Sequence, residues 1–172
     1  MHVFLTGEIQ VGKTTVIAKT IQGLKMSYGG FKTYFGKDRE CDDRFLYLNS
    51  VLEPNNIDDQ NRIVEFRKDQ FPLVSTQKFD SDGVRLIKEA RSHADLIVMD
   101  ECGNLENEAI AFQDEILAAL DQDKPILGVI KLASSGWTDL IRNHKNVTLI
   151  TVTKENREQL PEILVRHFSK KN

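Results

Sequence analysis

The sequence predicts a three-layer α/β fold, in which helices cover both faces of a mostly parallel sheet. Short apolar runs alternate along the chain with longer segments whose apolar residues recur at helical spacing, and this alternation is typical of parallel sheets. Several of the short runs are apolar throughout, as expected for strands buried on both faces. The chain has 172 residues, the length of one domain, so we expect a single domain over residues 1–172.

Composition excludes several classes of protein. Apolar residues make up 40% and charged residues 28% of the chain, and the net charge is only −3, which indicates a folded core. The sequence lacks the basic excess of general nucleic-acid and anionic-membrane binders, so we expect neither partner. Cys41 and Cys102 have no CxxC or Cys/His ligand spacing, which argues against a zinc module and a disulfide scaffold.

The apolar runs indicate a soluble, cytoplasmic protein. The first run, Val3-Phe4-Leu5, ends at Thr6-Gly7-Glu8, too soon for a signal peptide. The longest apolar stretches, such as residues 96–99, fall far short of the about 20 residues that a membrane helix needs.

The N-terminal elements follow from apolar spacing and from glycine. His2–Thr6 is a short apolar run and predicts a buried strand, and residues 7–15 form a turn-like loop. Apolar residues at helical spacing then predict a helix over residues 13–28, which we expect Gly29-Gly30 to end. Phe31–Phe35 is rich in β-forming residues and predicts the next strand.

The middle of the chain predicts a small β-rich insertion over roughly residues 36–79. Arg44–Leu48 and Arg62–Phe66 have the composition of short strands, and Pro54-Asn55-Asn56 supplies turn chemistry between them. We therefore expect a hairpin in this segment.

The second half predicts a regular alternation of strand and helix. The apolar runs predict strands over residues 96–99, 125–130 and 147–152. Helical spacing of apolar residues predicts helices over residues 80–93, 106–120, 138–142 and 155–168.

The loop after the first strand carries a phosphate-binding motif. Residues 7–14, Gly-Glu-Ile-Gln-Val-Gly-Lys-Thr, match the P-loop pattern G-x-x-x-x-G-K-[ST], with a strand before and a helix after. Glycines let successive N–H groups face one anion, and the helix N-terminus adds its positive end. We expect Glu8 to point away from the phosphates. The predicted nucleotide-binding residues are Gly7, Glu8, Ile9, Gln10, Val11, Gly12, Lys13, Thr14 and Thr15.

Two residues of this motif have individual roles in the prediction. The Lys13 ammonium should reach the β- and γ-phosphates and act in catalysis. The Thr14 hydroxyl should ligate Mg²⁺, the cofactor that the motif predicts.

A second candidate element is the apolar strand that ends in Asp100-Glu101. In a P-loop enzyme, Asp100 would hold Mg²⁺, and Glu101 would orient the attacking water and accept its proton. The alternative is a buried strand that ends in two surface acids. The intact P-loop favours the catalytic interpretation.

With both motifs in view, the chain resembles the small P-loop nucleoside-triphosphatases, a family with thermophile members and a human cancer-related member. The similarity covers most of the chain: residues 7–15 (GEIQVGKTT), 30–33 (GFKT), 100–106 (DECGNLE), 124–130 (KPILGVI), 152–157 (VTKENR) and Leu160-Pro161. The resemblance implies a RecA-like, additional-strand P-loop fold and Mg²⁺-dependent hydrolysis of ATP, GTP and other triphosphates with loose base choice. It carries the metal role to Asp100 and the water role to Glu101.

The sequence departs from the family pattern in three places. After Thr33 the family has a glutamate and then an arginine-rich stretch, whereas Tyr34, Phe35 and Gly36 follow here. Cys102 replaces an isoleucine, and residues 36–79 match worst.

Three further residues have two interpretations each. Asn156 and Arg157 follow the last strand, where they either contact the base or ribose or form a helix N-terminus with Thr153 as its cap. Glu106 either belongs to the edge of the active site or favours the start of its helix, and we favour the second role.

The sequence does not identify an arginine that stabilises the transition state. The candidates are Arg39, Arg44, Arg142 and Arg157, and a partner or second subunit could supply one.

Two other functions stay open. The chain could be a P-loop kinase for a small acceptor, with Arg62–Lys68 as a lid, or a nucleotide-dependent switch with little turnover. Protein partners and self-association are not predicted.

Overall fold

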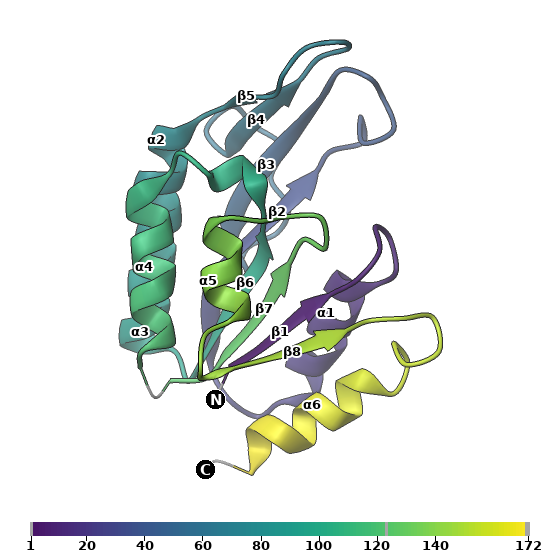
Figure 1. The fold of residues 1–172 in the computed structure, drawn as a ribbon, viewed down its shortest axis with the longest axis vertical. Coiled ribbons are helices and arrows are strands. Elements are labelled where there is room, and N and C mark those ends of the chain that lie inside the picture. Colours follow the sequence, from purple (N-terminus) through teal and green to yellow (C-terminus); the bar gives the residue numbers. More distant parts are fainter. Residues whose placement is uncertain (1, 123, 171–172) are drawn as a thin grey trace.

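A computed structural model describes residues 2–122 and 124–170, and its centre is one eight-stranded sheet with helices on both faces (Figure 1). The strands lie in the order β5-β4-β3-β2-β6-β7-β1-β8. Their bounds are β1 (His2–Thr6), β2 (Tyr28–Phe35), β3 (Arg44–Ser50), β4 (Arg62–Phe66), β5 (Leu73–Val74), β6 (Leu96–Cys102), β7 (Ile126–Ile130) and β8 (Val147–Thr151). The helices are α1 (Lys13–Gly23), α2 (Thr76–Lys78), α3 (Val84–His93), α4 (Ile110–Leu120), α5 (Trp137–Arg142) and α6 (Leu160–Ser169), with a π-turn η1 (Phe79–Gly83) and a 3₁₀ turn η2 (Asn104–Glu106).

The sheet confirms the predicted α/β fold with a mostly parallel sheet. Strands β2, β6, β7, β1 and β8 pair in parallel, whereas β3, β4 and β5 extend the sheet in antiparallel fashion. Strand β7 lies between β1, which precedes the glycine-rich loop, and β6, which carries the acid pair. In Figure 1, α1 and α6 lie on one face of the sheet, and α3, α4 and α5 lie on the other.

Side chains of the central strands alternate between two hydrophobic cores, because successive residues of a strand point to opposite faces. Val3 and Leu5 of β1 join the core under α1 and α6, whereas Phe4 joins the core under α3, α4 and α5. Strand β6 divides in the same way, with Leu96 and Val98 in the first core and Ile97 and Met99 in the second. Burial on both faces explains why these strands are apolar throughout.

The predicted end of the first helix is wrong. Helix α1 ends at Gly23, and Gly29 and Gly30 lie inside β2. A Cβ atom on Gly29 would lie 3.2 Å from the Cβ of Ala90, and one on Gly30 would lie 2.1 Å from the carbonyl oxygen of Val98. These glycines therefore allow close packing on α3 and β6.

Other boundaries also differ from the prediction. Strand β6 continues through the acid pair to Cys102, and the last helix begins at Leu160 because residues 154–159 form turns. The segment 36–79 contains β3, β4 and the two-residue strand β5, so it is more than a hairpin. Within the described residues, no helix is long and apolar enough to cross a membrane.

Candidate active site

The loop between β1 and α1 is a tight turn that depends on glycine. Gly7 has φ of 139° and Gly12 has φ of 109°, a region that favours glycine. A Cβ atom on Gly7 would lie 2.6 Å from the carbonyl oxygen of Val152, so the loop also packs closely on the end of β8. Gln10 has a positive φ of 62° as well. The loop leads directly into α1, whose N-terminus can attract an anion.

The side chain of Lys13 folds back onto this loop. Its Nζ atom donates hydrogen bonds of 2.9 Å to the carbonyl oxygens of Gly7 and Glu8. The ammonium group is thereby held over the turn that the motif predicts for the phosphates. Glu8, Ile9 and Gln10 are exposed, whereas Val11 is buried beneath the loop.

Thr14 lies close to Asp100 on the wall of one cavity, so the start of α1 meets the end of β6. Asp100 is only 5% exposed, and burial raises its pKa to about 7. The nearby hydroxyl of Thr14 and the charges of Lys13 and Lys32 oppose this rise in pKa, and the neighbouring charge of Glu101 adds to it. The structure therefore brings together the two residues that the sequence predicts as Mg²⁺ ligands.

Glu101 is half-buried and lies within electrostatic reach of Lys13 and Lys131. Burial raises its pKa, while the charges of Lys13 and Lys131 lower it. The peptide bond between Asp100 and Glu101 is cis. A carboxylate with a raised pKa next to the phosphate loop is suited to accept a proton.

Glu106 is a third buried carboxyl group, only 3% exposed. It accepts a hydrogen bond of 2.8 Å from the N–H group of Gly103, which fixes the turn after β6. Burial raises its pKa to about 7; the charge of Glu101 adds to the rise and that of Lys131 opposes it. Its carboxylate thus holds the turn that follows the acid pair and interacts electrostatically with Glu101.

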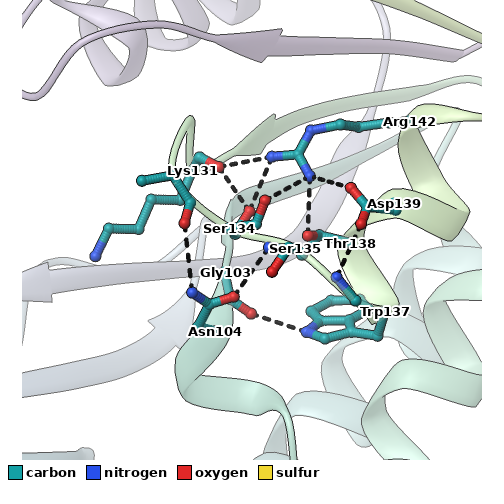
Figure 2. A network of polar contacts seen from close by, with 11 residues as sticks. Gly103, Asn104, Lys131, Ser134, Ser135, Trp137, Thr138, Asp139 and Arg142 are labelled. Atoms are coloured by element: carbon teal, nitrogen blue, oxygen red, sulfur yellow. Dashed lines mark hydrogen bonds and ion pairs between the residues drawn. The ribbon is translucent and has the colours of Figure 1, made fainter.

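A network of polar contacts joins the turn after β6 to the loop after β7 (Figure 2). The indole N–H of Trp137 donates a hydrogen bond of 2.8 Å to the carbonyl oxygen of Gly103. The guanidinium of Arg142 donates to the backbone carbonyls of Lys131 and Ser134, at 2.8 and 2.9 Å. The Lys131 side chain packs over Gly103, since a Cβ atom there would lie 3.5 Å from its Cδ. The network fixes the segment that carries Lys131 next to Glu101 and Glu106.

Asn156 and Arg157, the predicted pair after β8, lie in different surroundings. The side chain of Asn156 is held within its own turn, because it accepts from the N–H of Thr153 at 2.8 Å and donates to the carbonyl of Thr151 at 2.9 Å. Arg157 instead lies against the glycine-rich loop. Its Nη1 atom is 3.4 Å from the carbonyl oxygen of Val11, and its Cδ would lie 3.6 Å from a Cβ atom on Gly12.

The other candidate arginines lie in different surroundings. Arg44 packs over the rings of Phe35 and Phe66, with its Cζ 5.7 and 4.8 Å from their centroids. Arg39 is exposed in the turn before β3, and Arg142 belongs to the network above. Of the four, Arg157 is the one that contacts the glycine-rich loop among the described residues. In the predicted lid, Arg62, Arg67 and Lys68 form ion pairs with Asp59, Glu65 and Asp42.

Sequence reasoning missed Lys32 and Lys131 as parts of the site. Lys32 pairs in register with Asp100 across β2 and β6, and burial lowers its pKa. Lys131 directly follows β7. Lys32 comes close to Asp100, and Lys131 to Glu101, only because of the order of the strands in the sheet. The one sequence feature that could have indicated either lysine is its position near the end of a strand.

The residues that could hold a metal are few. Within residues 2–122 and 124–170, no group of three or more His, Cys, Asp or Glu side chains could hold a metal ion. Thr14 and Asp100 offer oxygen atoms, the donor type that Mg²⁺ prefers.

The chain is similar to proteins named as nucleoside triphosphatases. A family model described as NTPase matches residues 2–165. The nucleoside-triphosphatase THEP1 of Thermotoga maritima is 27% identical over 165 residues, which span 93% of this chain and 91% of that protein. The protein of the same name from Thermofilum pendens is 30% identical over 178 residues, spanning 96% of this chain and 93% of its own length.

Two solved structures share the fold. The crystal structure of THEP1 from Aquifex aeolicus superposes with a TM-score of 0.79 at 20% identity and covers 98% of this chain and 99% of its own. The solution structure of a human cancer-related nucleoside triphosphatase gives a TM-score of 0.70 at 24% identity, covering 99% of this chain and 98% of its own.

Proposed function

Because this chain belongs to the NTPase family, we propose that it hydrolyses nucleoside triphosphates to the diphosphate and phosphate, with Mg²⁺ and with loose base choice. The relatives named nucleoside-triphosphatase THEP1 support the reaction class. ATP and GTP are the proposed principal substrates.

The single observation that carries the proposal is the close approach of Thr14 to Asp100, which line the same cavity. It joins the phosphate loop to the acid strand although β7 lies between β1 and β6. Lys13 lies within the same loop, so a triphosphate on the loop would meet the acids at its γ-phosphate end.

The pair Thr14 and Asp100 fits Mg²⁺. A hydroxyl and a carboxylate that line the same cavity can both turn to one cation, and Mg²⁺ normally keeps several waters and substrate phosphates as its other ligands. When bound, Mg²⁺ would neutralise charge on the β- and γ-phosphates.

Glu101 is the proposed general base. It accepts the proton of a water molecule that attacks the γ-phosphorus, and its raised pKa brings the carboxylate closer to the working pH. Lys13 leaves the carbonyls of Gly7 and Glu8 and pairs with the phosphates, where its charge stabilises the transition state. Lys131, held beside Glu101, adds positive charge at the same place.

Loose base choice is supported by the residues after β8. Asn156 is engaged within its own turn, and the sequence has no N-K-x-D motif for reading guanine. We assign Arg157 to the nucleotide, because a planar guanidinium can stack on any base.

We propose that the protein acts in the cytoplasm. Both cysteines are free, Cys41 exposed and Cys102 buried, as is usual where thiols stay reduced.

The test is phosphate release from ATP, GTP, CTP and UTP by the purified protein, with Mg²⁺ and with EDTA. We expect release from all four in Mg²⁺ and loss of release in EDTA. Release from one nucleotide alone would contradict loose base choice, and no release from any would contradict the proposed function.

A further inference from the structure

A cavity of about 320 Å³ opens beside the candidate active site, between α1, β2 and the segment after β3. Thr14 and Asp100 line one end of it, so it begins where the phosphate loop meets the acid strand. Arg157 follows β8, and β8 and β2 lie on opposite sides of β1 in the sheet. The cavity is therefore separate from the region that we assign to the base of the triphosphate.

The walls of the cavity are mostly apolar and contain two aromatic rings. The apolar and aromatic lining is Ile17, Ala18, Ile21, Tyr28, Tyr34, Val51 and Val98. The ring of Tyr34 stacks on that of Tyr47, with centroids 5.9 Å apart, and its hydroxyl donates a hydrogen bond of 2.7 Å to the carbonyl of Asn56. A pre-formed apolar site of this size, with few polar groups, is typical of a small-molecule site and suits a rigid, planar ligand.

Four further polar side chains complete the lining: Gln22, Lys32, Thr33 and Asn55. The ammonium of Lys32 is fixed by a hydrogen bond of 2.5 Å to the carbonyl of Glu53. Gln22 and Asn55 add two amide groups, and an amide both donates and accepts hydrogen bonds. Such groups match the mixed donors and acceptors at the edge of a nitrogen-containing aromatic ring.

The charges at the active-site end select against an anionic ligand. Asp100 is the carboxyl group that lines the cavity at this end, near the γ-phosphate of the proposed triphosphate. A phosphate or carboxylate on the ligand would be repelled by this acid and by the γ-phosphate, whereas a neutral hydroxyl would not.

We propose that this cavity binds a nucleoside-class molecule, a heteroaromatic ring that carries a neutral hydroxyl, as an acceptor of the γ-phosphoryl group. The inference rests on the proposed function, because the bound triphosphate supplies the group. The hydroxyl oxygen bonds to the γ-phosphorus, the bond from that phosphorus to the β,γ-bridging oxygen breaks, and the nucleoside diphosphate leaves with the electron pair. The hydroxyl proton passes to Glu101, which takes a proton from water when no acceptor is bound.

The experiment incubates the protein with Mg²⁺, γ-labelled ATP and each of adenosine, guanosine, cytidine and thymidine, and separates labelled nucleoside monophosphate from labelled phosphate. We expect at least one nucleoside to become labelled while the release of phosphate falls. Phosphate release without any labelled nucleoside overturns the acceptor site and leaves the hydrolase intact. The absence of both products contradicts the proposed function itself.

Two variants locate the site. Ala18 is exposed on α1 and lines the cavity, so Ala18→Trp should fill it and lower nucleoside phosphorylation by about tenfold or more, the loss expected when a ligand's apolar contacts are blocked. Hydrolysis without nucleoside should stay within about twofold of wild type. The matched control is Ala111→Trp, an exposed alanine on α4 across the sheet, which should keep both activities.

Asn55→Ala serves if the tryptophan variant does not fold, because Asn55 is exposed in a loop. It should raise KM for the nucleoside and leave hydrolysis unchanged. A foldable Ala18→Trp or Asn55→Ala that phosphorylates nucleosides as wild type does would overturn the cavity as the acceptor site.

Discussion

The carboxylate of Glu106 accepts a hydrogen bond from the N–H group of Gly103, so a buried acid holds the turn that follows the acid strand. Gly103 also accepts from the indole of Trp137 through its carbonyl. The backbone after Glu101 is therefore fixed from two sides, by Glu106 at the end of η2 and by Trp137 at the start of α5.

Glu106 makes the stability of the ligand-free protein depend on pH. Burial raises its pKa to about 7, above the 4.5 of an exposed glutamate, so between these values the native state binds more protons than the unfolded state. The free energy of unfolding should therefore fall as pH rises through this window. Glu106→Gln, which stays neutral, should match wild type near pH 4, below the unfolded pKa, and exceed it near pH 8 by at most about 3 kcal/mol.

Urea denaturation at several pH values measures this difference. Glu108→Gln is the control, because Glu108 is exposed two residues away. Parallel pH profiles for wild type and Glu106→Gln would show that Glu106 is not the titrating group.

Glu101→Gln removes the proposed base and keeps the shape of the side chain. We expect nucleotide binding close to wild type and a loss of hydrolysis of about 10²- to 10⁴-fold, the usual contribution of a general base. Calorimetric titration with a non-hydrolysable analogue measures binding, and phosphate release measures turnover. Turnover at the wild-type rate would refute the assignment of Glu101.

Lys13→Ala removes the ammonium that lies over the glycine-rich loop. Tight nucleotide binding should be lost, with Kd rising by about 10- to 100-fold, because hydrogen bonds to a charged group are worth about 1.5–3 kcal/mol. Calorimetry with ATP in Mg²⁺ is the measurement, and Lys25→Ala, an exposed lysine just beyond α1, is the control. Equal affinity in wild type and Lys13→Ala would place the phosphates elsewhere.

Trp137→Phe keeps a ring but removes the donor to the carbonyl of Gly103. An unsatisfied buried acceptor costs about 1–3 kcal/mol, so the midpoint of urea denaturation should fall. Because the same carbonyl belongs to the turn after the acid strand, kcat should fall as well, with little change in nucleotide affinity. A variant that loses stability but keeps kcat would limit the network to a structural role.

Arg157→Ala removes the one candidate arginine that contacts the glycine-rich loop among the described residues. KM for all triphosphates should rise by about five- to tenfold, close to 1 kcal/mol, as expected for a partly exposed guanidinium on an aromatic ring. Lys154→Ala in the same turn is the control, since Lys154 is exposed. A loss of kcat at constant KM would instead assign Arg157 to the transition state.

The sequence predicts best those features that depend on residues close together along the chain. The strand 2–6, the loop 7–14 and the start of α1 at Lys13 follow from a local pattern, and the structure has them there. The meeting of Thr14 with Asp100 also follows, because both motifs place their groups at the carboxyl ends of parallel strands.

Features set by tertiary packing could not be predicted from the sequence. Gly29-Gly30 has the composition of a helix stop, but it lies in β2 because α3 and the carbonyl of Val98 approach too closely for a side chain. Lys32 joins the site only because β2 pairs with β6 in a register that sets it beside Asp100. No spacing within one segment carries that information.

The intervening strand β7 also sets how wide the reaction centre can be. Neighbouring strands lie about 4.8 Å apart, so the strand that leads into the glycine-rich loop and the strand that ends in the acids are separated by roughly 10 Å. Direct pairing of β1 and β6 would halve that gap and crowd out one reactant. The extra strand thus leaves width for a terminal phosphate and an incoming oxygen nucleophile side by side.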